Sequence, residues 1–112
     1  VEIDPVLAAT ARHNLRQAGI TNVSVEVGDA SQGWSASSPY DVIVISSALR
    51  ELPEAFLQQL KPGGRLVAFI GEPPVMEAQL VTRTGDRAFT TINLFETVVA
   101  PLSSRKRPRF VF

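Results

Sequence analysis

The chain has 112 residues, which corresponds to one domain or to part of one. Hydrophobic residues make up 45% and charged residues 20%, so the composition is that of a soluble globular protein and excludes disordered and fibrous classes. The longest apolar runs are four or five residues, which predicts no membrane-spanning helix. Cysteine is absent, which excludes disulfides and thiolate chemistry and is compatible with the cytoplasmic location that we expect.

The net charge of zero conceals an uneven distribution along the chain. Residues 105–112 contain four basic residues and no acidic one, while residues 1–104 contain seven basic and eleven acidic residues. A mildly acidic body of this kind is a poor general binder of nucleic acid, so we do not expect nucleic acid as a partner. Nor do we expect a membrane as a partner, because the apolar runs are too short to span one.

The first segments predict a strand end, a helix and a second strand. Residues 1–4 (VEID) are typical of the end of a buried strand. Asp4 fits a helix N-cap, Pro5 fits the first helical position, and Gly19 fits the residue that ends the helix. Valines alternate with polar residues over 23–27, which predicts a half-buried strand.

The middle of the chain predicts a second pair of strands around a short helix. A Gly/Ser-rich loop over 28–39 leads into a β-branched run over 40–48, which predicts a strand covered on both faces. A short helix is expected from Pro53, followed by a turn at 61–64 and a buried strand over 65–71.

The last segments predict a hairpin, with two strands within 77–100 joined near 84–87. Alternating strands and helices indicate an α/β fold with a doubly wound, partly parallel sheet, to which the hairpin adds an antiparallel edge. Ligands of such sheets bind beyond the carboxyl ends of the strands.

Glu2 and Asp29 stand at two of these strand ends. A carboxylate at Glu2 can accept both hydroxyls of a ribose, or it can be a solvated strand end. Gly28 lets the backbone approach a planar ligand, and Asp29 can accept a hydrogen bond from the amine of adenine or form an ordinary Asx-turn. The residues alone leave these alternatives open.

Ser46 and Ser47 follow the third predicted strand and can donate hydrogen bonds to a substrate, although a plain loop start is equally compatible. They are not part of a hydrolase nucleophile elbow, because the chain contains no Gly-x-Ser-x-Gly motif. Trp34 is a hydrophobic plug or a stacking surface. His13 is the only histidine and is expected on the solvent face of its helix, so no metal site is predicted.

Taken together, five segments resemble the C-terminal half of protein-L-isoaspartate O-methyltransferases, which are class I S-adenosylmethionine-dependent methyltransferases. The segments are VEID, GDASQGW, PYDVIVISSA, ELPEAFLQQLKPGGRLV and LFETVVAPL. The resemblance covers essentially the whole chain and points to a short bacterial branch of the family. Residues 1–112 are therefore expected to be the C-terminal part of a single Rossmann-like methyltransferase domain.

The resemblance implies a site. Glu2, with Ile3 beside it, matches the residues that hold the cofactor ribose. Gly28, Asp29 and Ala30 match the segment that binds adenine. The serines at 46 and 47 match the strand end that leads into the methyl-transfer pocket.

The reaction implied is methylation of the isoaspartyl carboxylate in damaged proteins, with S-adenosyl-L-methionine as cofactor and isoaspartyl peptides or proteins as partners. No catalytic residue is named, because the carboxylate and the sulfonium methyl group are already reactive and the protein mainly positions them. The oligomeric state stays open.

Two segments near the expected substrate side depart from the usual family pattern. Residues 48–51 (ALRE) replace small residues and a proline, and residues 69–71 (FIG) replace Pro-Val-Gly.

The glycine-rich cofactor loop of this fold is expected upstream of residue 1, together with a central strand that lies between the strands ending at Glu2 and at Ser46. We therefore expect the 112-residue chain alone to be unstable or self-associating, and inactive. Alternatives are a class I methyltransferase acting on a small molecule or RNA, a nicotinamide-dependent Rossmann enzyme, and a non-catalytic methyltransferase-like interaction module.

Overall fold

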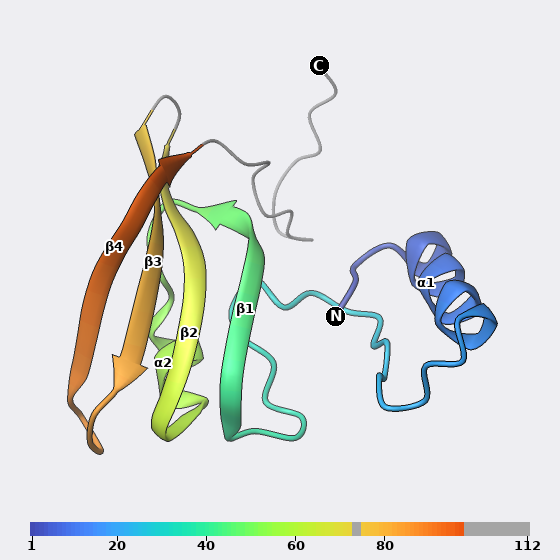
Figure 1. Cartoon of the computed structure of the whole chain (residues 1–112), viewed down its shortest axis with the longest axis horizontal. Helices are drawn as coiled ribbons and strands as arrows, with labels where there is room; N and C mark the ends of the chain where they lie inside the picture. The colour runs from blue at the N-terminus through green and yellow to red at the C-terminus, as the bar shows by residue number, and fades with distance from the viewer. Residues whose placement is uncertain (73–74, 98–112) are drawn as a thin grey trace. The chain divides into compact units, whose positions relative to one another are not determined.

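The structure is a computed structural model that describes residues 1–72 and 75–97 (Figure 1). The chain divides into two compact units, with Val1–Ser31 in the first and the described residues from Gln32 in the second. Each unit is described by itself. In the described part of the chain no helix is long and apolar enough to cross a membrane. The predicted basic tail and the segment 98–102 of the resemblance lie outside the described residues.

The first unit is built on helix α1 (Pro5–Gln17), whose two ends confirm the sequence prediction. Asp4 is the N-cap, and its carboxylate accepts hydrogen bonds from the backbone N–H groups of Val6 at 2.8 Å and Leu7 at 3.5 Å. Gly19 ends the helix at a φ of +71°, where glycine carries no steric penalty. The backbone N–H of Ile20 then donates to the carbonyl of Leu15 at 3.0 Å, which completes a Schellman motif.

The predicted strand over 23–27 is wrong as a full strand. It forms one isolated parallel bridge, between Glu2 and Val27. The physical reason lies in the backbone partners: the guanidinium of Arg12 donates to the carbonyl of Val25 at 2.6 Å, so a side chain rather than a neighbouring strand satisfies this group. In the described residues, this bridge to Glu2 takes the place of the longer strand pairing that the sequence predicts.

The second unit is a four-stranded sheet with one short helix. Its strands are β1 (Tyr40–Leu49), β2 (Leu60–Glu72), β3 (Val75–Arg83) and β4 (Phe89–Thr97), in the order β1-β2-β3-β4. The parallel pair β1 and β2 is connected through α2 (Glu54–Gln58), as the sequence predicts from Pro53 onwards. β3 and β4 form the predicted antiparallel hairpin, which pairs antiparallel with β2.

The predicted turn at 61–64 is instead the first part of β2. Gly63 has a φ of +81°, and the pairing with β1 shifts between Tyr40 and Val42, so the segment is an irregular strand start rather than a separate turn. Gly64 lies close to the backbone of β1 and of the first residues of β2. A Cβ added there would meet the carbonyl oxygens of Lys61 at 2.7 Å and of Asp41 and Tyr40 at 3.1 Å.

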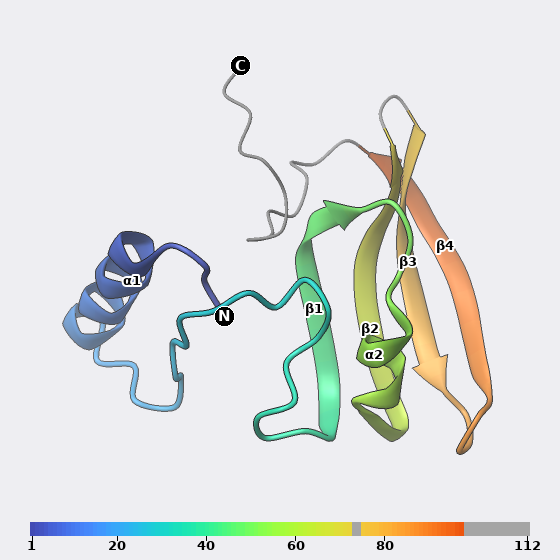
Figure 2. The same ribbon diagram turned by 180° about the vertical axis from the view of Figure 1, so that it is seen from behind.

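The core of the second unit lies between α2 and one face of the sheet, as Figure 2 shows from the side of the helix. Phe56 of α2 packs among buried residues of the strands, namely Ile45, Leu60, Leu66, Ala68 and Val81. Burial of a side chain such as Leu66, which has no exposed surface, contributes about 1.5–3 kcal/mol.

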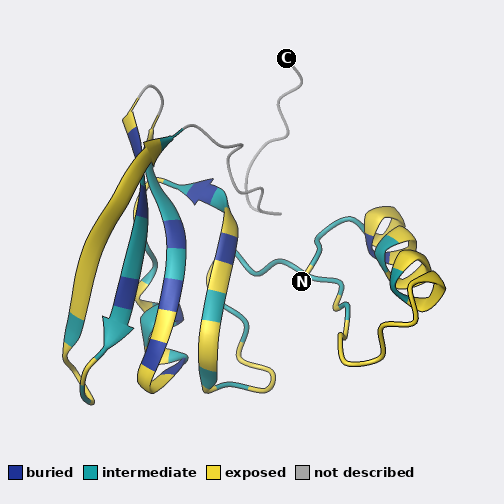
Figure 3. Cartoon of the chain, viewed as in Figure 1, coloured by how far each residue is buried: buried dark blue, intermediate teal, exposed yellow. Residues whose placement is uncertain are grey.

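The prediction that the first strand of this sheet is covered on both faces is wrong for the described residues. β1 is an edge strand, and Val42 and Val44 are 52% and 66% exposed. β4 at the other edge is exposed along most of its length, whereas β2 and β3 contain most of the buried positions (Figure 3).

Candidate functional site

The parallel bridge of the first unit places Glu2 and Gly28 side by side. The backbone N–H of Glu2 donates to the carbonyl of Glu26 at 2.8 Å, and the N–H of Gly28 donates to the carbonyl of Glu2 at 3.0 Å. Both segments run in the same direction, so the residues that follow them lie at one common edge. This edge contains all five residues proposed from the sequence for the cofactor, and all are half-buried: Glu2, Ile3, Gly28, Asp29 and Ala30.

The carboxylate of Glu2 is oriented by a local contact. Its Oε1 accepts a hydrogen bond from the backbone N–H of Asp4 at 3.1 Å. Asp4 itself caps α1, so its carboxylate has a structural role, as the sequence predicts. The edge therefore presents one carboxylate whose position is fixed by the backbone that leads into the helix.

Asp29 forms the Asx-turn that the sequence left open as an alternative. Its Oδ1 accepts a hydrogen bond from the backbone N–H of Ser31 at 2.9 Å. This bond orients the Asp29 side chain at the edge.

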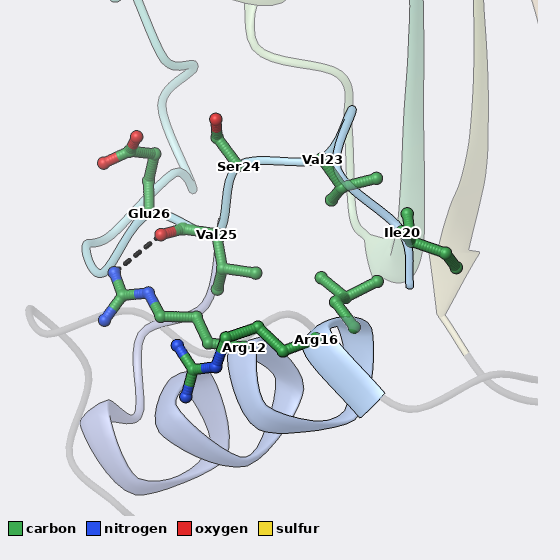
Figure 4. A pocket seen from close by; sticks show the side chains of 8 residues that line it. Arg12, Arg16, Ile20, Val23, Ser24, Val25 and Glu26 are labelled. Carbon is green, nitrogen blue, oxygen red and sulfur yellow. Dashed lines mark hydrogen bonds between the residues drawn. The ribbon is translucent and has the colours of Figure 1, made fainter. Parts of the chain in front are cut away.

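A shallow hollow of about 340 Å³ lies elsewhere in the first unit, and the sequence did not indicate it. Arg12 and Arg16 of α1 face Val23 and Val25 across it, and the dashed line in Figure 4 marks the bond from Arg12 to the carbonyl of Val25. This guanidinium stabilises the packing of the segment on α1.

Ser46 and Ser47 lie within β1 and not after it, which corrects the sequence prediction. Val44 pairs with Val67 and Ala48 pairs with Phe69, so three residues of β1 stand opposite the single residue Ala68. This irregularity is a bulge, a feature that redirects side chains and is frequent beside functional sites. Ser46 is exposed and Ser47 is half-buried at this point.

The carboxyl ends of β1 and β2 are joined by an ion pair that the sequence did not reveal. Leu49 pairs with Ile70, and beyond this pair the Nε of Arg50 contacts the Oε1 of Glu72. Both side chains are largely solvent-exposed, at 75% and 58%. The two segments that depart from the family pattern, 48–51 and 69–71, are thus neighbours in the sheet.

Trp34 belongs to a loop at the opposite, amino end of β1. Its backbone N–H donates to the Oε1 of Gln59 at 2.9 Å, and its carbonyl accepts from the hydroxyl of Tyr40 at 2.8 Å. The hydroxyl of Tyr40 also donates to the carbonyl of Ala36. These bonds fix the backbone of the loop that precedes β1.

Metal ligands are not grouped in the described ranges, 1–72 and 75–97: no three side chains of His, Cys, Asp or Glu form a possible metal site there. His13 is exposed on α1. The first unit offers the carboxylates of Glu2 and Asp29 and the backbone of residues 28–30, and the second unit, considered separately, offers the hydroxyls of Ser46 and Ser47.

Comparison with known proteins decides the family. The family model described as protein-L-isoaspartate(D-aspartate) O-methyltransferase matches residues 1–107. The chain belongs to this family. A protein-L-isoaspartate O-methyltransferase of Methanoculleus marisnigri is 44% identical over 86 residues, which cover 76% of this chain and 39% of that protein. Protein-L-isoaspartate O-methyltransferase 2 of Polaromonas sp. is 33% identical over 107 residues, which cover 95% of this chain and 51% of that protein.

Solved structures of this family agree with the fold. A protein-L-isoaspartate O-methyltransferase matches with a TM-score of 0.82 at 30% identity, over 92% of this chain and 33% of its own. A putative protein-L-isoaspartate O-methyltransferase from Plasmodium falciparum, in complex with S-adenosyl-L-homocysteine, matches with a TM-score of 0.77 at 19% identity, over 91% of this chain and 50% of its own. The second likeness supports the fold alone. The predicted partial Rossmann-like methyltransferase fold is confirmed.

Proposed function

We propose that residues 1–112 are the C-terminal part of an S-adenosylmethionine-dependent methyltransferase that methylates isoaspartyl carboxylates in proteins. The chain spans 39% and 51% of the two relatives named above, so the whole activity needs residues outside this segment. The observation that carries the proposal is the Glu2–Val27 bridge, since it places an acidic residue and the Gly28-Asp29-Ala30 segment at one edge.

The residues at this edge fit the cofactor chemically. The carboxylate of Glu2 is oriented by the Asp4 N–H and can accept hydrogen bonds from the two hydroxyls of a ribose. Asp29 is held by its turn and can accept from an exocyclic amine. Ile3 and Ala30 add half-buried apolar surface beside these polar groups.

The serines that match the substrate side of the family, Ser46 and Ser47, lie at the bulge of β1 within the second unit. Hydroxyls of Ser46 and Ser47 can donate hydrogen bonds to a carboxylate and orient one of its oxygens for reaction. When bound, S-adenosylmethionine supplies an activated methyl group. The chain need not provide a general base, because a carboxylate with a pKa of about 4 is already ionised at neutral pH. The role of the protein is to position the carboxylate and the methyl group and to exclude water from them.

A calorimetric titration of S-adenosylhomocysteine tests this assignment. The protein is an extended chain, in which the upstream part of the Methanoculleus marisnigri relative precedes Val1. We expect the extended chain to bind, and Glu2→Ala and Asp29→Ala each to weaken binding about tenfold or more, the range of one to two lost charge-assisted hydrogen bonds.

Glu26→Ala is the matched control, because this exposed carboxylate lies one residue before the bridge. It should leave the affinity unchanged. Absence of binding by the extended chain would favour a non-catalytic interaction module over a methyltransferase. Equal losses for all three variants would contradict the assignment of Glu2 and Asp29 to the cofactor.

A further inference from the structure

Arg50 and Glu72 form a charged pair at the edge of the sheet where ligands of parallel α/β folds bind. β1 and β2 are parallel, and the pair joins the residue directly after β1 to the last residue of β2. The bulge that contains Ser46 and Ser47 lies just before it on the same strand. The pair therefore stands next to the serines assigned to the substrate carboxylate.

The guanidinium of Arg50 can bind a second carboxylate in addition to that of Glu72. A guanidinium is permanently charged and offers several donors in a planar fork, so it can contact more than one carboxylate at once. The side chain of Arg50 is 75% exposed and is accessible from solvent. Glu72 contacts it through one oxygen at Nε, so it competes with an incoming anion for the guanidinium.

We propose, resting on the function proposed above, that Arg50 determines substrate specificity by binding an acidic side chain next to the isoaspartyl residue of the peptide. Glu72 competes with the peptide carboxylate for the guanidinium of Arg50. The resulting preference is for isoaspartyl peptides in which an aspartate or glutamate flanks the damaged residue. The contact is made at the surface, so its effect on KM is modest and decreases as salt is added.

A pair of isoaspartyl peptides tests the inference on the extended chain defined above. The two peptides are identical except for Asp or Asn directly after the isoaspartyl residue. We expect the Asp peptide to have a KM about three- to fivefold lower at low salt, with kcat unchanged. Arg50→Gln should reduce this KM ratio to near one, and Glu72→Gln should increase it by removing the competing carboxylate.

Lys61→Gln is the matched control. Lys61 pairs with Asp41 at 3.4 Å, so it forms an exposed ion pair between the same two strands at their amino ends, and the substitution removes the same charge. It should leave the KM ratio unchanged. Equal KM values for the two peptides in the wild type, or equal effects of Arg50→Gln and Lys61→Gln, would overturn the inference.

Failure of the inference and failure of the proposed function are distinguishable. If both peptides are methylated with the same KM, the methyltransferase assignment stands and the role of Arg50 is wrong. If neither peptide is methylated and S-adenosylhomocysteine does not bind, the proposed function is wrong and the role of Arg50 fails with it.

Discussion

The backbone of Glu2 accepts a hydrogen bond from the N–H of Gly28 at 3.0 Å across the parallel bridge of the first unit. This contact joins two residues that are 26 positions apart in sequence. It brings the acidic strand end and the Gly28-Asp29-Ala30 segment to one edge, although the segments around them form no extended ladder. The proposed cofactor site depends on this pairing.

The cap of α1 gives the first prediction. Asp4→Ala should lower the free energy of unfolding of the extended chain by about 0.5–2 kcal/mol, because the N–H of Val6 loses its acceptor. Asp4→Ser should restore most of the loss. Urea unfolding followed by circular dichroism measures both. A loss of cofactor binding in Asp4→Ser with normal stability would show instead that Asp4 is a ligand group.

The glycine at 64 gives a second prediction. Gly64→Ala should destabilise the extended chain by about 1–3 kcal/mol, because its Cβ would meet three backbone carbonyl oxygens that cannot move away cheaply. Gly85→Ala is the control, since its nearest neighbour is the Cβ of Ala88 at 3.7 Å, an ordinary contact. Equal thermal midpoints for the two variants would contradict the packing described for the start of β2.

Trp34 is the only tryptophan, so its fluorescence reports on the loop that precedes β1. Gln59→Leu removes the acceptor of the Trp34 N–H and should increase quenching of this fluorescence by acrylamide. The stability cost should be about 1–3 kcal/mol, the cost of leaving a partly buried donor without a partner. Gln58→Leu, at an exposed neighbouring position, should change neither quantity.

The open edge of β1 predicts the behaviour of the 112-residue chain on its own. Because Val42 and Val44 are exposed on an edge strand, the chain should self-associate, and Val44→Lys should reduce association by placing a charge on that edge. Val75→Lys is the control, at a residue that is 58% exposed but belongs to an internal strand. Sedimentation velocity separates the outcomes, and a cooperatively melting monomer would refute the prediction.

The sequence predicted most of the elements because local signals agreed with the fold. Asp4, Pro5 and Gly19 carry the chemistry of helix ends, and α1 begins and ends where they predict. The hairpin also agrees, because the break near 84–87 separates two β-branched segments.

The prediction was wrong where the outcome depends on distant partners. The valines over 23–27 alternate with polar residues as in a strand. In the structure, however, this segment forms a single bridge to Glu2 and accepts a hydrogen bond from the side chain of Arg12. The prediction for Ser46 and Ser47 was wrong for the same reason. The bulge that contains them depends on the pairing of β1 with β2 and cannot be recognised from the residues of β1 alone. The Arg50–Glu72 pair depends on that register too, which is why the sequence did not reveal it.

The most direct test of the proposed function is transfer of the labelled methyl group of S-adenosylmethionine by the extended chain. The substrates are an isoaspartyl peptide and the same peptide with an ordinary aspartyl linkage. We predict base-labile methyl ester on the isoaspartyl peptide alone, and its loss in Glu2→Ala but not in Glu26→Ala. Equal labelling of both peptides, or no labelling by an extended chain that binds S-adenosylhomocysteine, would contradict the assignment.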